Sequence, residues 1–413
     1  MKAVVIGGGI IGLFSAYYLN KEGYEVTIID KGDLSANSSL GNLGMVVPSH
    51  FIPLASPGIV AKGLKWLTNS RSPFYIRPSL SLDLVNWGLK FIKNANQKKC
   101  DEAAPYLKDY NLFSKQLFQD LAKEPDFDFF YHQKGILMYY NTEEGEKEEV
   151  HVAKMAQDMG LDVGILSPSE LQKLEPDLKL KVLGAAHYRC DAHLNPNLLN
   201  GQLRSYLVAK GVKIIKNKKI NGFEYKNEVI SKAICDGEVF EADQFILSPG
   251  AWMKEVSDLL HINIPMMPGK GYTFNVENKP EMKIPAILCE ARVAITPMGE
   301  KIRFGGTMEL GKMNAKVNMN RVEGIVNSIP KYFENIDLAM PAEKDVWYGF
   351  RPCSPDGLPY LGRADQYKNL IVAGGHSMMG LSLAPATGKM VAELATDKKT
   401  TIDLKLFSPD RYN

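Results

Sequence analysis

The chain begins with a short apolar run that leads directly into closely spaced glycines, in the sequence MKAVVIGGGIIGLFSAYYL. Residues 3–6 are small or branched and apolar, which is typical of a buried parallel strand. Gly7, Gly9 and Gly12 then follow the pattern G-x-G-x-x-G. Its first glycine permits a tight turn, its second lets the backbone approach a pyrophosphate, and its third lets a helix pack closely on the strand. This order predicts a strand, a nucleotide-binding turn and a helix.

The segment after the glycines completes the start of a doubly wound α/β domain. A helix is expected from about residue 11 to residue 22, where Gly23 ends it, and a strand is expected at residues 26–29. Asp30 follows that strand, and an acidic residue at this place can accept hydrogen bonds from ribose hydroxyls. The alternative is a solvated acid at a strand end. The complete strand, turn, helix and strand favour the nucleotide.

Length, charge and cysteine content exclude several classes of protein. At 413 residues the chain is too long for one compact core, so two domains are expected. The formal net charge of +2 gives no general attraction for nucleic acid. The five cysteines are far apart and odd in number, which favours a reducing compartment over disulfides or a metal site. The N-terminal segment lacks the features of a signal peptide, and no apolar run is long enough to span a bilayer. We therefore expect a cytoplasmic protein.

Three later segments bear on which nucleotide is bound. Residues 244–247 and 370–373 are expected strands, and each is followed by a turn that contains glycine. A last helix is expected from about Ser377 to Leu394. The loop SSLGNLG at residues 38–44 has a composition that lets the backbone lie flat against a large planar group. A ligand contacted from both ends of the chain favours FAD over NAD.

Together these segments resemble the FAD-dependent D-amino acid oxidase superfamily. The resemblance rests on GGGIIG at 7–12 with Asp30, SSLGNLG at 38–44, LSPGAW at 247–252, Gly271-Tyr272, GFRPCSPDGLPYLGR at 349–363 and GGHSMMGLSLAPATG at 374–388. Within the superfamily the chain is most similar to bacterial D-amino acid dehydrogenases of the small-subunit type, with which it shares the SSxxNxG, KGY and RPxxPDGxP patterns. The loop PSHFIP at 48–53 departs from their pattern, which leaves the substrate open.

The resemblance implies two discontinuous domains. A Rossmann-like FAD-binding domain would comprise residues 1–80, 195–262 and 347–413. A second, α+β substrate domain built on an antiparallel sheet would comprise residues 81–194 and 263–346. Helical apolar spacing at 84–122 and alternating apolar runs after Met266 agree with this division. We interpret the acidic run TEEGEKEEV at 142–150 as a solvated helix start without functional content.

The resemblance also implies which residues contact FAD. They are Gly7, Gly9, Ile10, Ile11, Gly12, Asp30, Lys31, Ser38, Ser39, Asn42, Leu43, Gly44, Gly250, Trp252, Gly375, Met378, Met379, Gly380 and Leu381. The positive N-terminal end of the last helix would face the flavin edge where negative charge collects on reduction. No metal ion is expected.

Four residues are candidates for the catalytic site. Arg351 would bind the substrate carboxylate with both arms of its guanidinium, and the family places its carboxylate-binding arginine in this motif. Tyr272 would donate a hydrogen bond to the carboxylate or line the pocket. His50 would reach the amine or the side chain of the substrate, and His376 would touch the isoalloxazine. For each residue the alternative is structural: an ion pair for the arginine, and a place in the core for the others.

The implied reaction is oxidation of a D-amino acid by hydride transfer from Cα to flavin N5. Water then hydrolyses the imine to a 2-oxo acid and ammonia, and a quinone-type acceptor takes the electrons. The alternatives are an oxidase or dehydrogenase of glycine, sarcosine or proline-type amines, including hydroxy-D-proline, and a flavin-carrying subunit of a larger complex. The oligomeric state, homo- or hetero-oligomer, stays open.

A basic amphipathic segment at residues 59–67 would allow weak contact with the inner face of the cell membrane. Its apolar face comprises Ile59, Val60, Gly63, Leu64 and Leu67, and Lys62 and Lys65 point elsewhere, with Trp66 near the boundary. The alternative is an ordinary surface helix packed on the FAD-binding domain.

Overall fold

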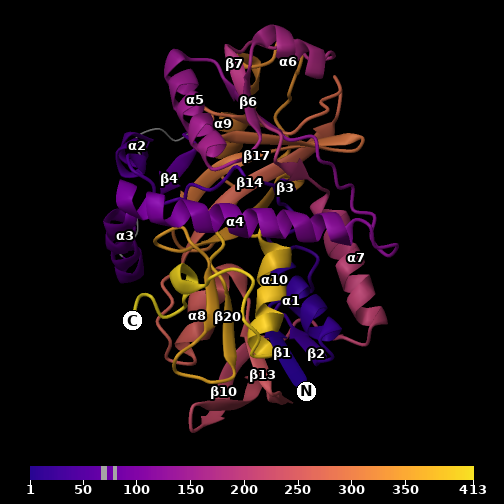
Figure 1. Cartoon of the computed structure of the whole chain (residues 1–413), viewed down its shortest axis with the longest axis vertical. Coiled ribbons are helices and arrows are strands. Elements are labelled where there is room, and N and C mark those ends of the chain that lie inside the picture. The colour runs from indigo at the N-terminus through magenta and orange to yellow at the C-terminus, as the bar shows by residue number, and fades with distance from the viewer. Residues whose placement is uncertain (67–71, 78–80) are drawn as a thin grey trace.

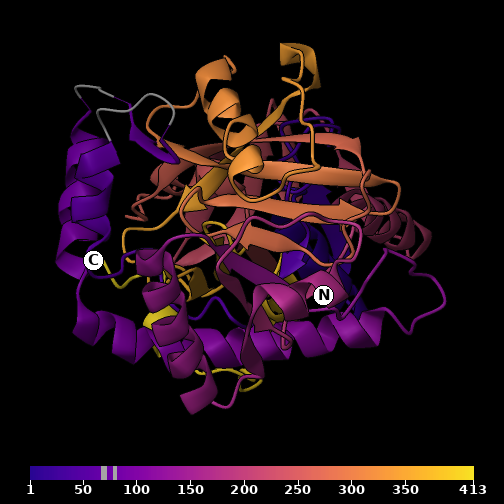
Figure 2. The same cartoon turned by 90° about the horizontal axis from the view of Figure 1, so that it is seen from above.

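The computed structural model of the protein describes residues 1–66, 72–77 and 81–413, with the backbone alone at residues 62 and 64–66. Figure 1 shows two regions along the long axis of the molecule, and the long helix α4 (Gln97–Leu121) runs across it where they meet. Figure 2 shows the same helix from above, along one side of the molecule. The chain passes back and forth between the regions, so each is built from separate segments.

Strands and helices are distributed over the whole chain. The strands are β1 (Lys2–Ile6), β2 (Glu25–Ile29), β3 (Met45–Val46), β4 (Phe74–Ile76), β5 (Ile136–Tyr140), β6 (Val163–Leu166), β7 (Gly184–Tyr188), β8 (Ala192–His193), β9 (Lys213–Ile215), β10 (Ile220–Lys226), β11 (Val229–Cys235), β12 (Glu238–Glu241), β13 (Gln244–Leu247), β14 (Met267–Glu277), β15 (Ala286–Leu288), β16 (Val293–Met298), β17 (Lys301–Leu310), β18 (Trp347–Cys353), β19 (Tyr360–Arg363) and β20 (Leu370–Gly374). The other helices are α1 (Ile10–Lys21), α2 (Ile59–Trp66), α3 (Leu82–Asn94), α5 (Glu143–Asp158), α6 (Pro168–Leu174), α7 (Pro196–Ala209), α8 (Met253–Asp258), α9 (Met319–Val326) and α10 (Ala384–Ala395).

The first region is a six-stranded sheet with the order β19-β20-β13-β1-β2-β9, parallel throughout except for β19. Successive residues of β1 face different cores: Ala3 and Val5 pack with α1 and α10, while Val4 and Ile6 pack with α8. A strand buried on both faces has a continuous apolar sequence, which is why this segment could be predicted. The expected strands and the first helix are confirmed to within one residue.

The last helix does not begin where the sequence predicts. α10 starts at Ala384 rather than near Ser377. Ser377 adopts a positive φ of 50°, which a right-handed helix cannot contain, and Pro385 occupies the first turn of the helix, where no N–H is needed. Residues 376–383 therefore form turns, and the expected contact of a helix N-terminus with the flavin edge is wrong in its position.

The second region is a nine-stranded, largely antiparallel sheet with the order β18-β14-β17-β16-β15-β5-β7-β6, to which β4 adds beside β17. The expected antiparallel sheet and the helices within 84–122 are thus confirmed. Two strands cross the expected domain boundaries: β4 and β18 lie in ranges assigned to the FAD-binding domain and pair with this sheet. The mixed α/β fold, with a Rossmann-like sheet and a second sheet, is the predicted class.

The five cysteines are free thiols. Within the ranges that the structure describes, no helix combines the length and the apolar character that crossing a bilayer requires.

Candidate active site

A large cavity lies at the carboxyl ends of β1 and β20, and β14, β17 and β18 of the second sheet close it on the other side. Its volume is about 1200 Å³. In open parallel sheets, ligands bind at this edge, outside the carboxyl ends of the strands. Both sheets supply lining residues, so a ligand in the cavity contacts segments from both ends of the chain.

The glycine turn forms one wall of this cavity. Gly7 has a φ of +109°, and a Cβ there would lie 2.3 Å from the carbonyl oxygen of Ser248. A Cβ on Gly12 would lie 1.9 Å from the carbonyl oxygen of Gly7, so α1 can pack this closely only with glycine. A Cβ on Gly9 would meet only Ser39 Oγ, at 3.6 Å. Gly7, Gly9, Ile10 and Ile11 line the cavity, while Gly12 lies behind them. The N-terminus of α1 is therefore open to an anionic ligand.

Asp30 and Lys31 follow β2 and line the same wall of the cavity as the glycine turn. Asp30 Oδ2 accepts a hydrogen bond from the Gly8 N–H at 2.7 Å, and its Oδ1 accepts one from the Gly32 N–H at 2.7 Å. Lys31 extends its Nζ to 3.7 Å from the ring centre of Trp252, and burial lowers the pKa of this lysine. All three predicted residues, Asp30, Lys31 and Trp252, line the cavity, as does Gly250.

The loop at 38–44 connects the helix start to the second sheet. Ser39 Oγ accepts a hydrogen bond from the Ile10 N–H at 3.0 Å, and Ser38 Oγ accepts one from the Phe350 N–H at 3.3 Å. Ser38, Ser39, Asn42 and Leu43 line the cavity. Gly44 does not, because it packs against the chain at Leu194, where a Cβ would lie 2.0 Å from a carbonyl oxygen.

Sequence reasoning missed the residue that holds this loop. Arg303, on β17, donates hydrogen bonds from NH1 to the carbonyl oxygens of Leu40 at 2.9 Å and Asn42 at 2.6 Å. It is buried, and burial lowers its pKa to about 10. No local motif marks such an arginine, because its partners are far away in the sequence.

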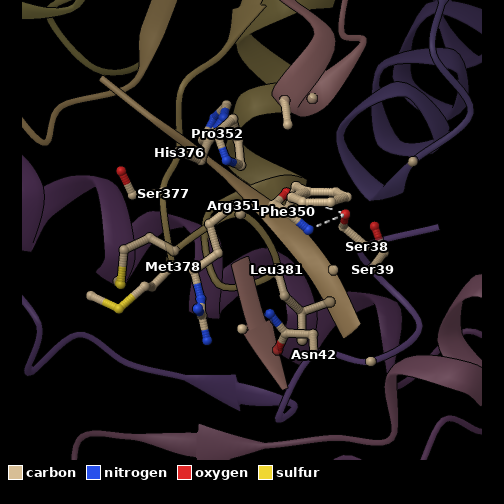
Figure 3. Close-up of a pocket in the computed structure, with 18 of the residues that line it drawn as sticks. Ser38, Ser39, Asn42, Phe350, Arg351, Pro352, His376, Ser377, Met378 and Leu381 are labelled. Carbon is tan, nitrogen blue, oxygen red and sulfur yellow. Dashed lines mark hydrogen bonds between the residues drawn. The ribbon is translucent and has the colours of Figure 1, made fainter. Parts of the chain in front are cut away.

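The turns after β20 form the part of the cavity wall that contains two methionines. His376, Met378, Met379, Gly380 and Leu381 line the cavity. Figure 3 shows this segment approaching Arg351 and the loop around Asn42. Gly375, which precedes this segment, does not line the cavity. It has a φ of +74°, and a Cβ there would lie 2.7 Å from the Tyr360 ring.

His376 is buried and shares a hydrogen bond of 3.0 Å between its Nε2 and Thr387 Oγ1. Burial lowers its pKa to about 3, so that the imidazole is neutral at physiological pH. His376 lines the cavity, and Thr387 of α10 holds its Nε2.

Arg351 lines the cavity, and Figure 3 shows its side chain beside Met378. Its NH1 donates a hydrogen bond to the carbonyl oxygen of Thr307 at 2.8 Å. A Cβ on Gly271 would lie 2.2 Å from NH1. The guanidinium therefore packs directly on the backbone of β14, where only glycine leaves room for it. Among the described residues no carboxylate forms an ion pair with it, and burial lowers its pKa. A half-buried arginine that no described carboxylate neutralises is a candidate binding site for an anion.

Tyr272 has a different position from the one that the sequence predicts. Its neighbours Gly271 and Thr273 line the cavity, and successive side chains of a strand point to opposite faces. The Tyr272 ring therefore lies in the core on the other face, where its hydroxyl donates to Glu309 Oε2 at 3.4 Å. It does not line the described cavity and has the structural place of a core tyrosine.

A further part of the cavity wall is polar. His50 lines it, with Nδ1 3.0 Å from Ser49 Oγ. Glu149, from the acidic run that we expected to be solvated, is only 7% exposed and also lines the cavity. Burial raises the pKa of its carboxyl. The expectation of a solvated run is wrong here because Glu149 shares the inward face of α5 with Ala153 and Ala156, a spacing that the sequence contains.

Comparison with known proteins identifies the architecture. A family model described as "DAO: FAD dependent oxidoreductase" matches residues 2–394. The chain belongs to this family. A D-amino acid dehydrogenase of Helicobacter pylori is 32% identical to the chain, with 98% of each sequence covered.

Solved structures show the same fold. Glycine oxidase from Geobacillus kaustophilus superposes with a TM-score of 0.78 at 22% identity, covering 100% of this chain and 98% of its own. L-proline dehydrogenase from P. horikoshii superposes with a TM-score of 0.74 at 19% identity, covering 100% and 97%. The protein is thus an FAD-dependent oxidoreductase of the DAO family, and its cofactor is FAD. The open N-terminus of α1, the bare glycine turn and the size of the cavity fit this cofactor.

Proposed function

We propose that the protein oxidises D-amino acids to 2-oxo acids and ammonia. One observation carries the proposal: Arg351, a half-buried arginine that pairs with no carboxylate of the described residues, lines the cavity that fits FAD. The dehydrogenases that the chain resembles over their full length act on D-amino acids by name. When bound, FAD supplies the acceptor for the hydride, which carries both electrons.

In this proposal the residues of the chain bind and orient. Gly7, Gly9 and Ile10 hold the diphosphate at the start of α1, Asp30 binds the ribose, and the loop at 38–44 supports the flavin with the turns at 376–381. Arg351 binds the substrate carboxylate, with Thr307 fixing the position of the guanidinium. Holding the substrate at two points is what presents one Cα–H face to the acceptor.

A substrate screen tests the proposal. The holoenzyme is mixed with an artificial electron-acceptor dye and with D-, L- and N-alkyl amino acids, glycine and hydroxy-D-proline. We expect the highest kcat/KM with a D-amino acid. A preference for glycine, sarcosine or proline-type amines would establish the alternative activity. A flavin that no amino acid reduces would indicate a subunit dependent on a partner.

We further propose that a quinone accepts the electrons and that the protein meets it at the inner face of the cell membrane. The segment first expected to make this contact is helix α2. Ile59 lines the cavity, and Gly63 is buried near Phe74. The side chains of Lys62, Leu64, Lys65 and Trp66, and all of Leu67, lie outside the described residues.

A better supported surface is one face of α3, which we call the α3 stripe. It consists of Leu82, Val85, Leu89 and Ile92, which are 81%, 55%, 63% and 57% exposed. These positions repeat at helical spacing and form one continuous face. Exposed Lys93 adjoins it, and Lys98 and Lys99 follow at the start of α4. An apolar stripe beside cations is complementary to a bilayer with anionic headgroups.

The opposite face of α3 connects the stripe to the candidate active site. Trp87 Nε1 donates a hydrogen bond to the carbonyl oxygen of Cys353 at 2.9 Å, two residues after Arg351. Trp87 also packs with Met308, which lines the cavity. A bilayer at the stripe would therefore bring a membrane quinone close to this wall of the cavity.

A further inference from the structure

A buried carboxylate lies behind His50, outside the cavity. Asp191, between β7 and β8, is completely buried. Its Oδ1 accepts a hydrogen bond from the Ser49 N–H at 3.0 Å, and its Oδ2 accepts one from Ser49 Oγ at 2.5 Å. The Cys190 thiol donates to Oδ1 at 3.4 Å. Every group that contacts the carboxylate donates a hydrogen, which suits the ionised form.

These contacts determine where His50 carries its hydrogen. Ser49 has a single hydroxyl hydrogen, and it is donated to Asp191. Ser49 Oγ can therefore only accept from His50 Nδ1, which lies 3.0 Å away. Burial lowers the pKa of His50 to about 4, with the charge of Arg292 acting in the same direction, so the ring is neutral at physiological pH. A neutral ring with its hydrogen on Nδ1 has a bare lone pair on Nε2.

The Nε2 atom is free to meet a ligand. His50 lines the cavity, and in the described ranges Nε2 has no hydrogen-bond partner in the protein. The same cavity is lined by Arg351, which donates a hydrogen bond to Thr307. The residue before Thr307, Gly306, lies against the backbone of Arg292. Within the cavity an acceptor on His50 thus complements the donors on Arg351.

We propose that Asp191 and Ser49 are positioning residues that hold neutral His50 as the Nδ1–H tautomer, so that Nε2 accepts a hydrogen bond from the substrate amino group. The identity of the ligand rests on the proposed function. The tautomer of His50 does not depend on that function. An amine has N–H donors, whereas an Nε2–H tautomer would present a donor to a donor. Arg351 and His50 both line this cavity, so the substrate carboxylate and the substrate amino group would each have their own partner there.

The arrangement predicts a dependence on pH. Burial raises the pKa of Asp191 to about 7, opposed by its hydrogen bonds from Ser49 and Cys190 and by the charge of Lys115. The charged and titratable groups around the pair are Arg292 at His50 and Lys115, Cys190 and Tyr188 at Asp191. When pH falls through about 7, Asp191 takes up a proton and donates a hydrogen bond to Ser49 Oγ. The Ser49 hydroxyl then donates to His50 Nδ1, and the neutral ring gives up its Nδ1 hydrogen to solvent and takes one up on Nε2. The acceptor on Nε2 is lost, and kcat/KM should fall on the acid side.

Nitrogen-15 NMR of the holoenzyme labelled at histidine tests the tautomer without substrate, with His50→Gln used to assign the signals. At pH 8 we expect a protonated Nδ1 and a bare Nε2. In Asp191→Asn the Ser49 N–H keeps the amide oxygen at the Oδ1 position, so the amide nitrogen donates to Ser49 Oγ and the tautomer should reverse. Asp162→Asn is the matched control, since Asp162 is an exposed acid nearby that pairs with Arg189, and it should match the wild type.

Kinetics provide the second readout. We expect Asp191→Asn to lower kcat/KM at pH 8 at least tenfold at unchanged flavin content and to remove the acid limb near pH 7. If Asp191→Asn does not fold, Ser49→Ala breaks the same connection and should give a mixture of tautomers. A hydrogen on Nε2 in the wild type at pH 8, or an unchanged tautomer in the variants, would overturn the proposal. A correct tautomer in a protein that oxidises no D-amino acid would instead refute the proposed function.

Discussion

At the scale of single residues, the site depends on Arg351, a cation that no carboxylate of the described ranges neutralises. Arg351→Lys keeps the charge but loses the planar pair of donors that matches a carboxylate. We expect the transition state to lose about 2 kcal/mol of stabilisation, which is the range for hydrogen bonds to charged groups. This loss lowers kcat/KM roughly 30-fold. Flavin content should not change. Arg189→Lys is the control, because Arg189 is 44% exposed at its side chain. Normal kcat/KM in Arg351→Ala would remove Arg351 from the site.

The glycine turn gives a second prediction at this scale. In Gly12→Ala the new methyl would lie 1.9 Å from the Gly7 carbonyl oxygen, so α1 must move away from β1. We expect loss of bound FAD, measured as the ratio of flavin to protein, together with a lower Tm. Gly201→Ala, in α7, is the control, because nothing lies within 4 Å of its Cβ position and alanine favours a helix. Full flavin content in Gly12→Ala would contradict the close packing described here.

Residues could be predicted from the sequence where their function is set by their neighbours in the chain. The glycines and Arg351 belong to local motifs. Asp191 and Arg303 could not be found, since Asp191 meets Ser49 across 142 positions and Arg303 meets Asn42 across 261. Tyr272 belongs to a motif too, but strand alternation turns its side chain away from the cavity.

At the scale of elements, patterns of apolar residues predicted strands and helices well, and turn chemistry predicted their ends less well. The strand at 244–247 is fully buried, and its own apolar sequence is enough to predict it. The start of α10 depends on the positive φ of Ser377, whose N–H donates to the carbonyl oxygen of Pro352 at 2.9 Å, a partner that is not local in the sequence. Periodicity also locates α3, but only the structure shows which of its faces is unpartnered.

The α3 stripe leads to the prediction for this scale. Leu82→Asn/Leu89→Asn should reduce co-sedimentation with phosphatidylglycerol vesicles at low salt, because the double variant removes much of the apolar face. Binding of the wild type should weaken with added salt and be weaker on phosphatidylcholine vesicles. Activity with a soluble dye should be unchanged.

The control for the α3 stripe is Leu198→Asn/Val208→Asn on α7, where the two residues are 44% and 58% exposed. Equal sedimentation of the three proteins would show that the stripe does not bind lipid. A wild type that is dimeric in sedimentation velocity, with a monomeric stripe variant, would assign the stripe to a second copy of the chain.

At the scale of the whole molecule, the cavity joins two sheets that the chain builds from interleaved segments. Gly9 and Gly374 belong to the six-stranded region, while Gly271 and Arg351 belong to the nine-stranded sheet, and all four residues line or close the same space. A ligand that contacts both sheets is bound by the folded state and not by the unfolded chain. Its binding free energy must therefore appear as stability.

Removal of FAD should accordingly destabilise the protein. At a free FAD concentration 100 times the Kd, binding adds about 2.7 kcal/mol to the free energy of unfolding. We expect the apoprotein to have a Tm lower by several degrees, and added FAD to restore it in a concentration-dependent way, measured by calorimetry. NADH at the same concentrations is the control and should have no effect, because the loop at 38–44 and the turns at 376–381 enclose a ligand that extends to the second sheet. A Tm that NADH raises and FAD does not would contradict the cofactor assignment. An apoprotein as stable as the holoenzyme would show that FAD does not bind the folded state in preference to the unfolded chain.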